Sequence, residues 1–126
     1  MSNNNILVID DSNTNLVLLE SLFKRNGYRV LSAMSGKEAL DLISRTVPDL
    51  IFLDLKMPEI DGFEFMKLLR DNSDWAEIPV VILSAISDKE TIIRGIEMGV
   101  VDYLTKPLEI EKVIHLTRNI LSSQNT

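Results

Sequence analysis

The sequence contains no cysteine and a single histidine, His115, among its 126 residues. Without cysteine, the chain can form no disulfide, no thiolate metal site and no thiol nucleophile. One histidine, far along the chain from the acidic residues described below, leaves almost no material for a triad hydrolase or a histidine-ligated zinc site. These absences argue against several common classes of enzyme and metalloprotein.

Glycine, proline and long apolar runs are also scarce. Five glycines and four prolines are too few for a linker-rich or disordered chain, and the longest apolar runs are four residues. The first residues, Met1 to Asn5, include no basic segment followed by an apolar stretch. We therefore expect neither a signal peptide nor a membrane span, and a cytoplasmic protein.

Net charge and size restrict the function further. The formal net charge of -6 opposes direct binding of nucleic acid, because phosphate backbones are gripped mainly by lysine and arginine. A chain of this length with 45% hydrophobic residues has room for one domain with a proper core. We expect that domain to span residues 5–122, with polar tails at 1–4 and 123–126.

Short apolar runs alternate with stretches of helical periodicity five times along the chain. The runs 6–9, 50–53 and 80–83 are continuously apolar, as in parallel strands covered on both faces, and the mixed runs 29–33 and 102–105 suit the edges of a sheet. Between them, apolar residues at helical spacing predict five helices, each with one buried stripe. The stripes are Leu16, Leu19, Leu22 and Phe23; Ala39, Leu40 and Ile43; Phe65, Met66 and Leu69; Ile92, Ile93 and Ile96; and Val113, Leu116 and Ile120.

Several helix ends are marked as well. Ser35 with Glu38, and Ser87 with Glu90, match the capping box, in which a hydroxyl and a carboxylate satisfy free amides at a helix start. Two glycines, at positions 27 and 99, stand where a left-handed residue would end the first and fourth helices. The whole pattern predicts an α/β fold of (βα)5 type, with one parallel sheet and right-handed crossovers.

Charged side chains follow three of the predicted strands. Asp10 and Asp11 end the first run, Asp54 ends the third, and Lys106 follows the fifth. In an open parallel sheet of order 2-1-3-4-5 these ends share one edge, where α/β proteins bind ligands, so we expect the four side chains to meet. Three neighbouring carboxylates repel one another, and a divalent cation removes that penalty. All-oxygen ligation suits Mg²⁺ or Mn²⁺.

The same residues suit phosphoryl transfer. Asp54 stands alone at the tip of the central strand and is the natural nucleophile, while the paired acids can hold the metal directly or through water. A carboxylate that attacks phosphorus builds negative charge on the equatorial oxygens, which the metal and Lys106 would offset. Ser84 adds a hydroxyl donor at the end of the fourth strand, and the small Ala85 leaves the site open to a bulky phosphodonor.

On these motifs the chain resembles the receiver domain of response regulators in two-component signalling, a family that includes chemotaxis regulators. The matching elements occur in order over nearly the whole sequence: Asp10-Asp11, Asp54-Leu55-Lys56-Met57-Pro58 with Asp61-Gly62, Ser84-Ala85, and Lys106-Pro107. Each is weak alone, and all four at these spacings are specific. The resemblance implies a flavodoxin-like three-layer sandwich and a phosphoprotein. It would be a signalling switch that catalyses only its own phosphorylation and dephosphorylation.

The resemblance also implies roles for individual residues. Asp54 would be the phosphoacceptor, and Lys106 would pair with the phosphoryl oxygens. The Lys106-Pro107 bond would be cis. The ligands of Mg²⁺ would be Asp10, Asp11, Asp54 and the backbone carbonyl of Lys56.

Partners and a switch follow from the same resemblance. The phosphoryl donor would be a histidine kinase or a histidine phosphotransfer protein of a phosphorelay. Ser84 would move toward the phosphoryl group and Tyr103 would turn into the vacated space, which would reshape the face formed by the fourth helix, fifth strand and fifth helix. That face would bind a downstream output domain or protein, or a second copy in a phosphorylation-dependent homodimer.

Two other functions remain open on the sequence alone. An aspartyl-phosphate phosphohydrolase of haloacid-dehalogenase type would need a second acid two residues after the nucleophile, but Lys56 occupies that position. A module that keeps the fold for interaction and ignores phosphorylation is the second alternative. Nucleotide-binding domains are excluded more firmly, because the chain has neither a G-x-G-x-x-G motif nor a P-loop.

Ile86 departs from the commonest pattern of the family and, with Lys56, flanks the path expected for the hydrolytic water. An apolar side chain cannot orient that water by hydrogen bonding, so we predict slow self-dephosphorylation. The substitution Ile86→Glu should therefore shorten the lifetime of phospho-Asp54, measured as loss of the acyl phosphate with time. An unchanged decay rate would show that Ile86 does not control the lifetime of phospho-Asp54.

Overall fold

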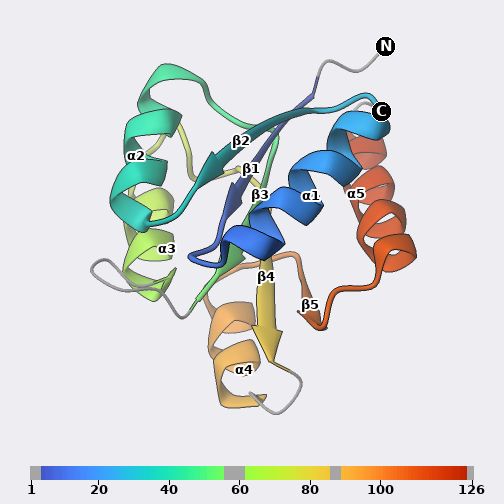
Figure 1. Cartoon of the computed structure of the whole chain (residues 1–126). Coiled ribbons are helices and arrows are strands. Elements are labelled where there is room, and N and C mark those ends of the chain that lie inside the picture. The colour runs from blue at the N-terminus through green and yellow to red at the C-terminus, as the bar shows by residue number, and fades with distance from the viewer. Residues whose placement is uncertain (1–3, 56–61, 86–88, 125–126) are drawn as a thin grey trace.

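Within the described residues, 4–55, 62–85 and 89–124, the computed structural model contains five strands that alternate with five helices (Figure 1). The strands are β1 (Asn5–Ile9), β2 (Arg29–Ala33), β3 (Leu50–Asp54), β4 (Val80–Ala85) and β5 (Asp102–Lys106). The helices are α1 (Asn13–Arg25), α2 (Gly36–Arg45), α3 (Gly62–Asp71), α4 (Lys89–Glu97) and α5 (Ile110–Gln124). This alternation confirms the α/β class expected from the periodicity of the sequence.

The strands pair in parallel and form one sheet in the order β2-β1-β3-β4-β5. This is the predicted order, and it places β1 beside β3 at the centre of the sheet. Ile9 lies opposite Leu53, and Asp54 lies opposite Leu83 on the other side of β3. The neighbouring central strands therefore end at the same level, which brings the residues after them to one edge.

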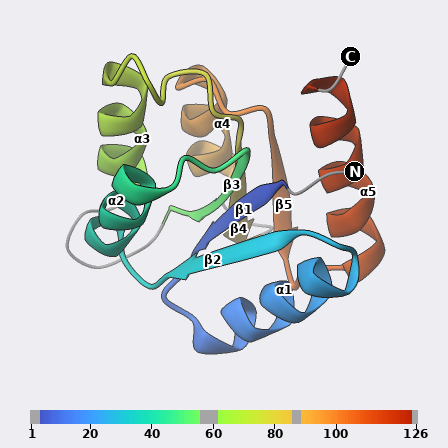
Figure 2. The same cartoon turned by 90° about the horizontal axis from the view of Figure 1, so that it is seen from above.

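Helices cover both faces of the sheet and complete a three-layer sandwich. α1 and α5 lie on one face, and α2, α3 and α4 lie on the other (Figure 2). Side chains alternate along the strands, so Ile6 and Val8 pack on the side of α1 and α5 while Leu7 and Ile9 pack on the opposite side. Coverage of both faces explains why the continuously apolar runs form the interior strands and the mixed runs form the two edges.

Several predicted helix boundaries are confirmed. The Ser35 hydroxyl accepts a hydrogen bond of 3.1 Å from the backbone N–H of Glu38 at the start of α2. Gly27 and Gly99 have φ values of 85° and 91°, the left-handed conformation that glycine adopts readily after a helix. The capping box predicted at Ser87 lies outside the described residues. Among the helices described, none has the length and apolar content needed to cross a bilayer.

The apolar stripes predicted for α1, α2 and α3 pack against the sheet. On α5, Val113 is buried, Leu116 and Ile120 are partly buried, and Thr117 is also fully buried. The hydroxyl of Thr117 donates a 2.7 Å hydrogen bond to the Val113 carbonyl, which satisfies it inside the core. These stripes are therefore confirmed, with one buried polar residue that the periodicity does not reveal.

The stripe predicted for α4 is wrong for two of its three residues. Ile93 is 56% exposed and Ile96 is 53% exposed. The buried residue of α4 is Gly95, which lies so close to β4 that an added Cβ would collide with Cδ1 of Ile82. With its glycine against the sheet, the helix turns these two isoleucines toward solvent. Helical periodicity identifies apolar positions, but it does not say which of them a neighbouring layer covers.

The first residue of α3 packs directly on the end of β3. The backbone N–H of Gly62 donates a 3.2 Å hydrogen bond to the Leu55 carbonyl. A Cβ at Gly62 would lie 2.5 Å from Cα of Leu55 and 3.1 Å from the carbonyl oxygen of Asp54. Glycine is therefore required here because the helix approaches the backbone of the central strand.

We predict that Gly62→Ala lowers the free energy of unfolding by about 1–3 kcal/mol, because the new methyl group must push α3 away from a backbone that cannot yield. Urea denaturation measures the change. Lys67→Ala, on the exposed side of the same helix, is the matched control and should stay within about 0.5 kcal/mol of the wild type. A Gly62→Ala protein as stable as this control would show that the close approach is not needed.

Candidate functional site

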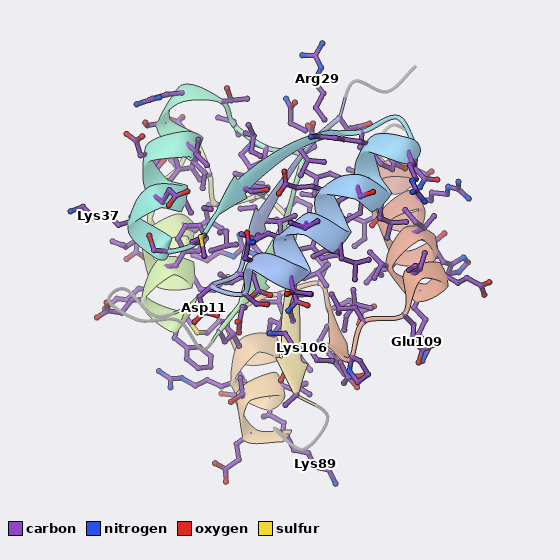
Figure 3. All side chains as sticks on the ribbon, viewed as in Figure 1. Asp11, Arg29, Lys37, Lys89, Lys106 and Glu109 are labelled. Carbon is purple, nitrogen blue, oxygen red and sulfur yellow. The ribbon has the colours of Figure 1, made fainter. Side chains whose placement is uncertain are left out.

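The residues predicted to form a site gather at the carboxyl edge of the sheet. Asp10 follows the last residue of β1, and Asp54 and Lys106 are the last residues of β3 and β5. Figure 3 shows Asp11 and Lys106 at the same end of the molecule, while Arg29, at the start of β2, lies at the opposite end. Strand register thus produces the cluster from segments that are far apart in the sequence.

Three carboxylates and one ammonium group lie within direct interaction distance. One carboxylate oxygen from each of Asp10, Asp11 and Asp54 lies within 4.8 Å of the others. The Lys106 ammonium lies 3.3 Å from Oδ2 of Asp54 and 3.5 Å from Oδ2 of Asp10. Asp10 is fully buried, Asp54 is 5% exposed, and Asp11 is open to solvent. The geometry expected from the sequence is therefore present.

Burial raises the electrostatic cost of placing these carboxylates together. Buried carboxylates lose hydration, and their mutual repulsion is screened less than it would be at the surface. Lys106 offsets part of that repulsion, but among the residues that the structure describes it is one cation beside three anions. The arrangement therefore favours a further cation on the open side, next to Asp11.

Two residues that sequence reasoning missed hold Asp10 in place. The backbone N–H of Ser12 donates to Oδ1 of Asp10 at 2.8 Å, and the Asn15 side-chain amide donates to Oδ2 at 3.0 Å. The hydroxyl of Ser12 in turn accepts from the Asn15 backbone N–H and caps α1. The start of α1 thus fixes the buried carboxylate. The signal for it in the sequence is the run of capping residues that follows Asp11.

A small cavity of about 120 Å³ adjoins Asp54. Ser84 and Ala85 line it from β4, Thr91 lines it from α4, and Lys106 closes it from β5. The Ser84 hydroxyl donates a 3.2 Å hydrogen bond to the carbonyl of Ala85. A cavity with a carboxylate, an ammonium group and two hydroxyls can hold a small anionic group such as a phosphoryl group. Thr91 carries no recognisable signal in the sequence.

The cluster also fits a divalent cation. Carboxylate oxygens are the ligands that Mg²⁺ and Mn²⁺ prefer, and Asp10, Asp11 and Asp54 present them close enough to share one ion. Lys56, whose carbonyl is the fourth predicted ligand, lies outside the described residues, as does Ile86. The roles of Asp10, Asp11, Asp54 and the Lys56 carbonyl as metal ligands remain predictions.

Three further residues with features considered in the sequence are Lys106, Tyr103 and His115. The Lys106-Pro107 bond is cis, as predicted. Tyr103 on β5 is 40% exposed, so its ring lies outside the core, and its inward movement remains a prediction. His115 is exposed on α5.

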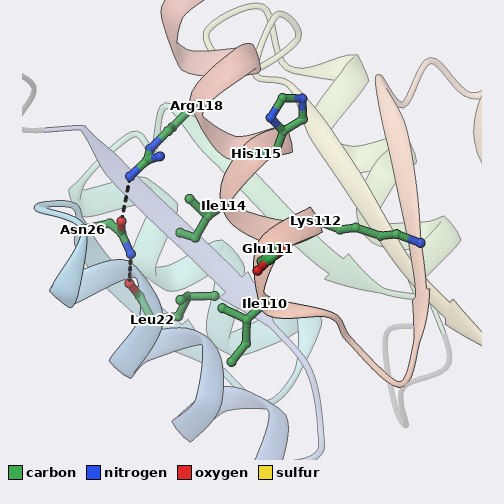
Figure 4. A pocket seen from close by; sticks show the side chains of 8 residues that line it. All are labelled: Leu22, Asn26, Ile110, Glu111, Lys112, Ile114, His115 and Arg118. Carbon is green, nitrogen blue, oxygen red and sulfur yellow. Dashed lines mark hydrogen bonds between the residues drawn. The ribbon is translucent and has the colours of Figure 1, made fainter.

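A larger hollow of about 690 Å³ lies elsewhere, between α1 and α5 (Figure 4). Leu22, Ile110 and Ile114 form its apolar lining, and Arg118 donates a 3.0 Å hydrogen bond to Asn26 across it. No member of the acidic cluster lines it. The size of a cavity therefore does not identify the site. The smaller cavity beside Asp54 is the one lined by charged and hydroxyl side chains that can bind a phosphoryl group.

Comparison with known proteins connects this edge to one family. A family model described as the response regulator receiver domain matches residues 6–118. Response regulator PleD of Caulobacter vibrioides is 41% identical over 104 residues, which are 82% of this chain and 23% of PleD. The polar-differentiation response regulator DivK of Brucella ovis is 33% identical over 119 residues, which are 92% of this chain and 94% of DivK.

A solved structure gives the same result. The receiver domain of Francisella response regulator 1452 superposes with a TM-score of 0.85 at 38% sequence identity, and the match covers 98% of this chain and 100% of that one. The chain spans less than a quarter of PleD, so similarity to PleD concerns one part of a longer protein.

We predict opposite changes in Mg²⁺ affinity for two substitutions at this edge. Asp11→Asn should weaken binding by roughly tenfold or more, because it removes one anionic ligand. Lys106→Met should strengthen binding by roughly three- to tenfold, because it removes a cation that repels the metal. Isothermal titration calorimetry measures both.

Asp41→Asn provides the control, since Asp41 is an exposed carboxylate on α2 paired only with surface Arg45 among the contacts described. Its affinity for Mg²⁺ should equal that of the wild type. If Asp11→Asn binds Mg²⁺ as tightly as this control, the metal does not use the acidic cluster as described.

Proposed function

The chain belongs to the response regulator receiver domain family, and from that membership we propose that Asp54 is its phosphoacceptor. The donor is a histidine kinase or a histidine phosphotransfer protein. The observation that supports this best is the distance of 3.3 Å between Lys106 and Asp54, beside two further carboxylates that share a potential metal position with Asp54.

Receiver domains are signalling switches of two-component systems. Response regulators receive phosphoryl groups from histidine kinases and act on output domains, and receiver domains bind Mg²⁺ at an acidic pocket. For this chain, the individual kinase, the output partner and a phosphorylation-dependent homodimer are parts of the proposal. The proposal also keeps the cytoplasmic location and the domain limits, 5–122, that the sequence predicts.

In the proposed reaction a carboxylate oxygen of Asp54 attacks the phosphorus atom of the donor phosphohistidine. A P–O bond to Asp54 forms as the P–N bond breaks, and the electron pair of that bond stays on the donor imidazole, which takes up a proton. Asp54 is buried at the end of β3, which restricts the positions that its carboxylate can take. An ionised carboxylate attacks phosphorus without the help of a general base.

Side chains around Asp54 stabilise the charge that develops on the transferred group. Mg²⁺ held by Asp10, Asp11, Asp54 and the carbonyl of Lys56 would supply positive charge for the equatorial phosphoryl oxygens. Lys106 supplies a second cation, and Ser84 can turn its hydroxyl from the Ala85 carbonyl toward the phosphoryl group. Asn15 and Ser12 keep Asp10 oriented throughout.

We further propose that phosphorylation changes the face formed by α4, β5 and α5, through Ser84 and Tyr103. The described part of this face already exposes apolar side chains: Ile93, Ile96, Val101, Tyr103 and Ile110. Exposed apolar area of this kind favours protein contact over solvent. Phosphorylation need change the balance of two packings by only about 1–3 kcal/mol to act as a switch.

The two alternative functions are less well supported. The family match favours a receiver over a phosphohydrolase of haloacid-dehalogenase type. The chain also lacks the second acid that such an enzyme needs, because position 56 is lysine. An interaction module that ignores phosphorylation has no need of a buried carboxylate next to two further acids and a lysine, since such a group lowers stability.

The proposal predicts that beryllofluoride, a phosphoryl analogue, binds the wild type in the presence of Mg²⁺ and that Asp54→Asn abolishes binding. The amide cannot form the oxygen–beryllium bond that an ionised carboxylate forms. Fluorine NMR detects the bound analogue directly. Asp74→Asn, an exposed acid before β4, is the control and should bind like the wild type.

Unaltered binding by Asp54→Asn would show that another residue is the acceptor. No binding by the wild type would favour the phosphorylation-independent module. Turnover of a phosphomonoester by the wild type would instead restore the phosphohydrolase alternative.

A further inference from the structure

We propose that the contact between Arg94 of α4 and Phe63 of α3 is a latch that holds α4 in the unphosphorylated position. This inference rests on the proposed function and adds residues to it. It identifies a connection from Asp54 to α4 that runs through α3 and is distinct from Ser84 and Tyr103. Four features of the described residues support it.

First, α4 buries fewer of its residues than the other two helices on its face. Gly95 is the one buried residue between Lys89 and Glu97, whereas α2 buries three residues and α3 buries four. A glycine contributes little apolar area, and Ile93 and Ile96 face solvent. Elements with few buried contacts open or shift most easily, so the position of α4 must depend on its remaining contacts.

Second, the C-terminal end of α4 is held at a fixed point. Arg70 on α3 donates to the carbonyl of Gly99, just after α4, at 3.1 Å. The same guanidinium also donates to the carbonyls of Ala76 at 3.0 Å and Ile78 at 2.9 Å. Burial lowers the pKa of Arg70, and nearby Glu77 partly opposes that shift. Arg70 thus ties the turn after α4 to the loop before β4.

Third, the middle of α4 contacts α3 through a cation and a ring. The guanidinium carbon of Arg94 lies 3.8 Å from the centre of the Phe63 ring. That geometry is a cation–π interaction, and Phe63 itself packs partly against the core. Because Arg94 is exposed and lies one residue before Gly95, its side chain fixes α4 laterally without filling the core.

Fourth, Phe63 is adjacent to the residue that contacts the backbone of the acceptor. Gly62 donates to the Leu55 carbonyl, and a Cβ on it would lie 3.1 Å from the Asp54 carbonyl oxygen. A rearrangement of the backbone at Asp54 and Leu55 therefore displaces the first turn of α3. Phe63 moves with that turn and changes its overlap with Arg94.

These features describe a switch in which the Arg94–Phe63 contact is present in the unphosphorylated state. While the ring and guanidinium stack, α4 stays in the position that leaves Thr91 beside the cavity next to Asp54. Loss of the stack frees α4, which remains held at the end that Arg70 anchors. Phosphoryl binding must then work against the latch, so weakening the latch should make the phosphorylated conformation easier to reach.

A double-mutant cycle with beryllofluoride tests this. Arg94→Gln and Phe63→Leu should each raise the apparent affinity for beryllofluoride by roughly two- to fivefold, the range that a partly exposed cation–π contact allows. The double variant should gain no more than either single variant, because both remove the same contact. Arg94→Lys keeps a cation over the ring, so its affinity for beryllofluoride should stay close to that of the wild type.

A spectroscopic readout separates a latch from simple loss of stability. In Arg94→Gln without ligand, the amide NMR signals of α4 should move part of the way toward their positions in the beryllofluoride complex. Arg45→Gln, which removes a surface arginine from α2, is the control and should change neither affinity nor these signals.

Unchanged or weaker beryllofluoride binding by Arg94→Gln, while the wild type binds normally, would overturn the latch and leave the proposed function intact. Additive gains in the double variant would also overturn it. Absence of binding by the wild type would contradict the proposed function itself, and the latch with it.

Discussion

The mutual repulsion of three carboxylates at one edge of the sheet governs what must surround them. Asp10 and Asp54 are almost completely removed from water and lie next to a third acid. A buried charge without compensation destabilises a protein strongly. Lys106, which reaches the acids from β5, supplies part of the compensation, and the divalent cation proposed for this edge would supply more.

The surrounding fold makes that arrangement sustainable. The fully buried apolar runs of β1 and β3 hold the two strands in register, so their terminal acids cannot move apart. Hydrogen bonds from Ser12 and Asn15 fix Asp10, and the close packing of Gly62 fixes the backbone after Asp54. In contrast, α4 contributes little to the core. The well-packed part of the molecule therefore holds the acidic cluster, and the helix that buries least is the one that we propose to move.

Most of the fold was predictable because local signals and burial agree. Continuous apolar runs identify strands covered on both faces, and glycines with left-handed φ end α1 and α4. Ile93 and Ile96 were not predictable, since periodicity shows where apolar side chains lie and not whether another layer covers them. At the site, the acids and lysine follow from strand ends. Asn15, Thr91 and the Arg94–Phe63 contact depend on how helices pack, which spacing in the sequence does not encode.

The proposed function requires one metal position and one acceptor oxygen within this cluster. A crystal structure of the protein with Mn²⁺ and beryllofluoride tests it most directly, because the anomalous signal of manganese locates the metal. We expect manganese directly coordinated by carboxylate oxygens of the cluster, with beryllium on Asp54 and fluoride contacts to Lys106. Manganese away from these acids, or beryllium on another side chain, would contradict it.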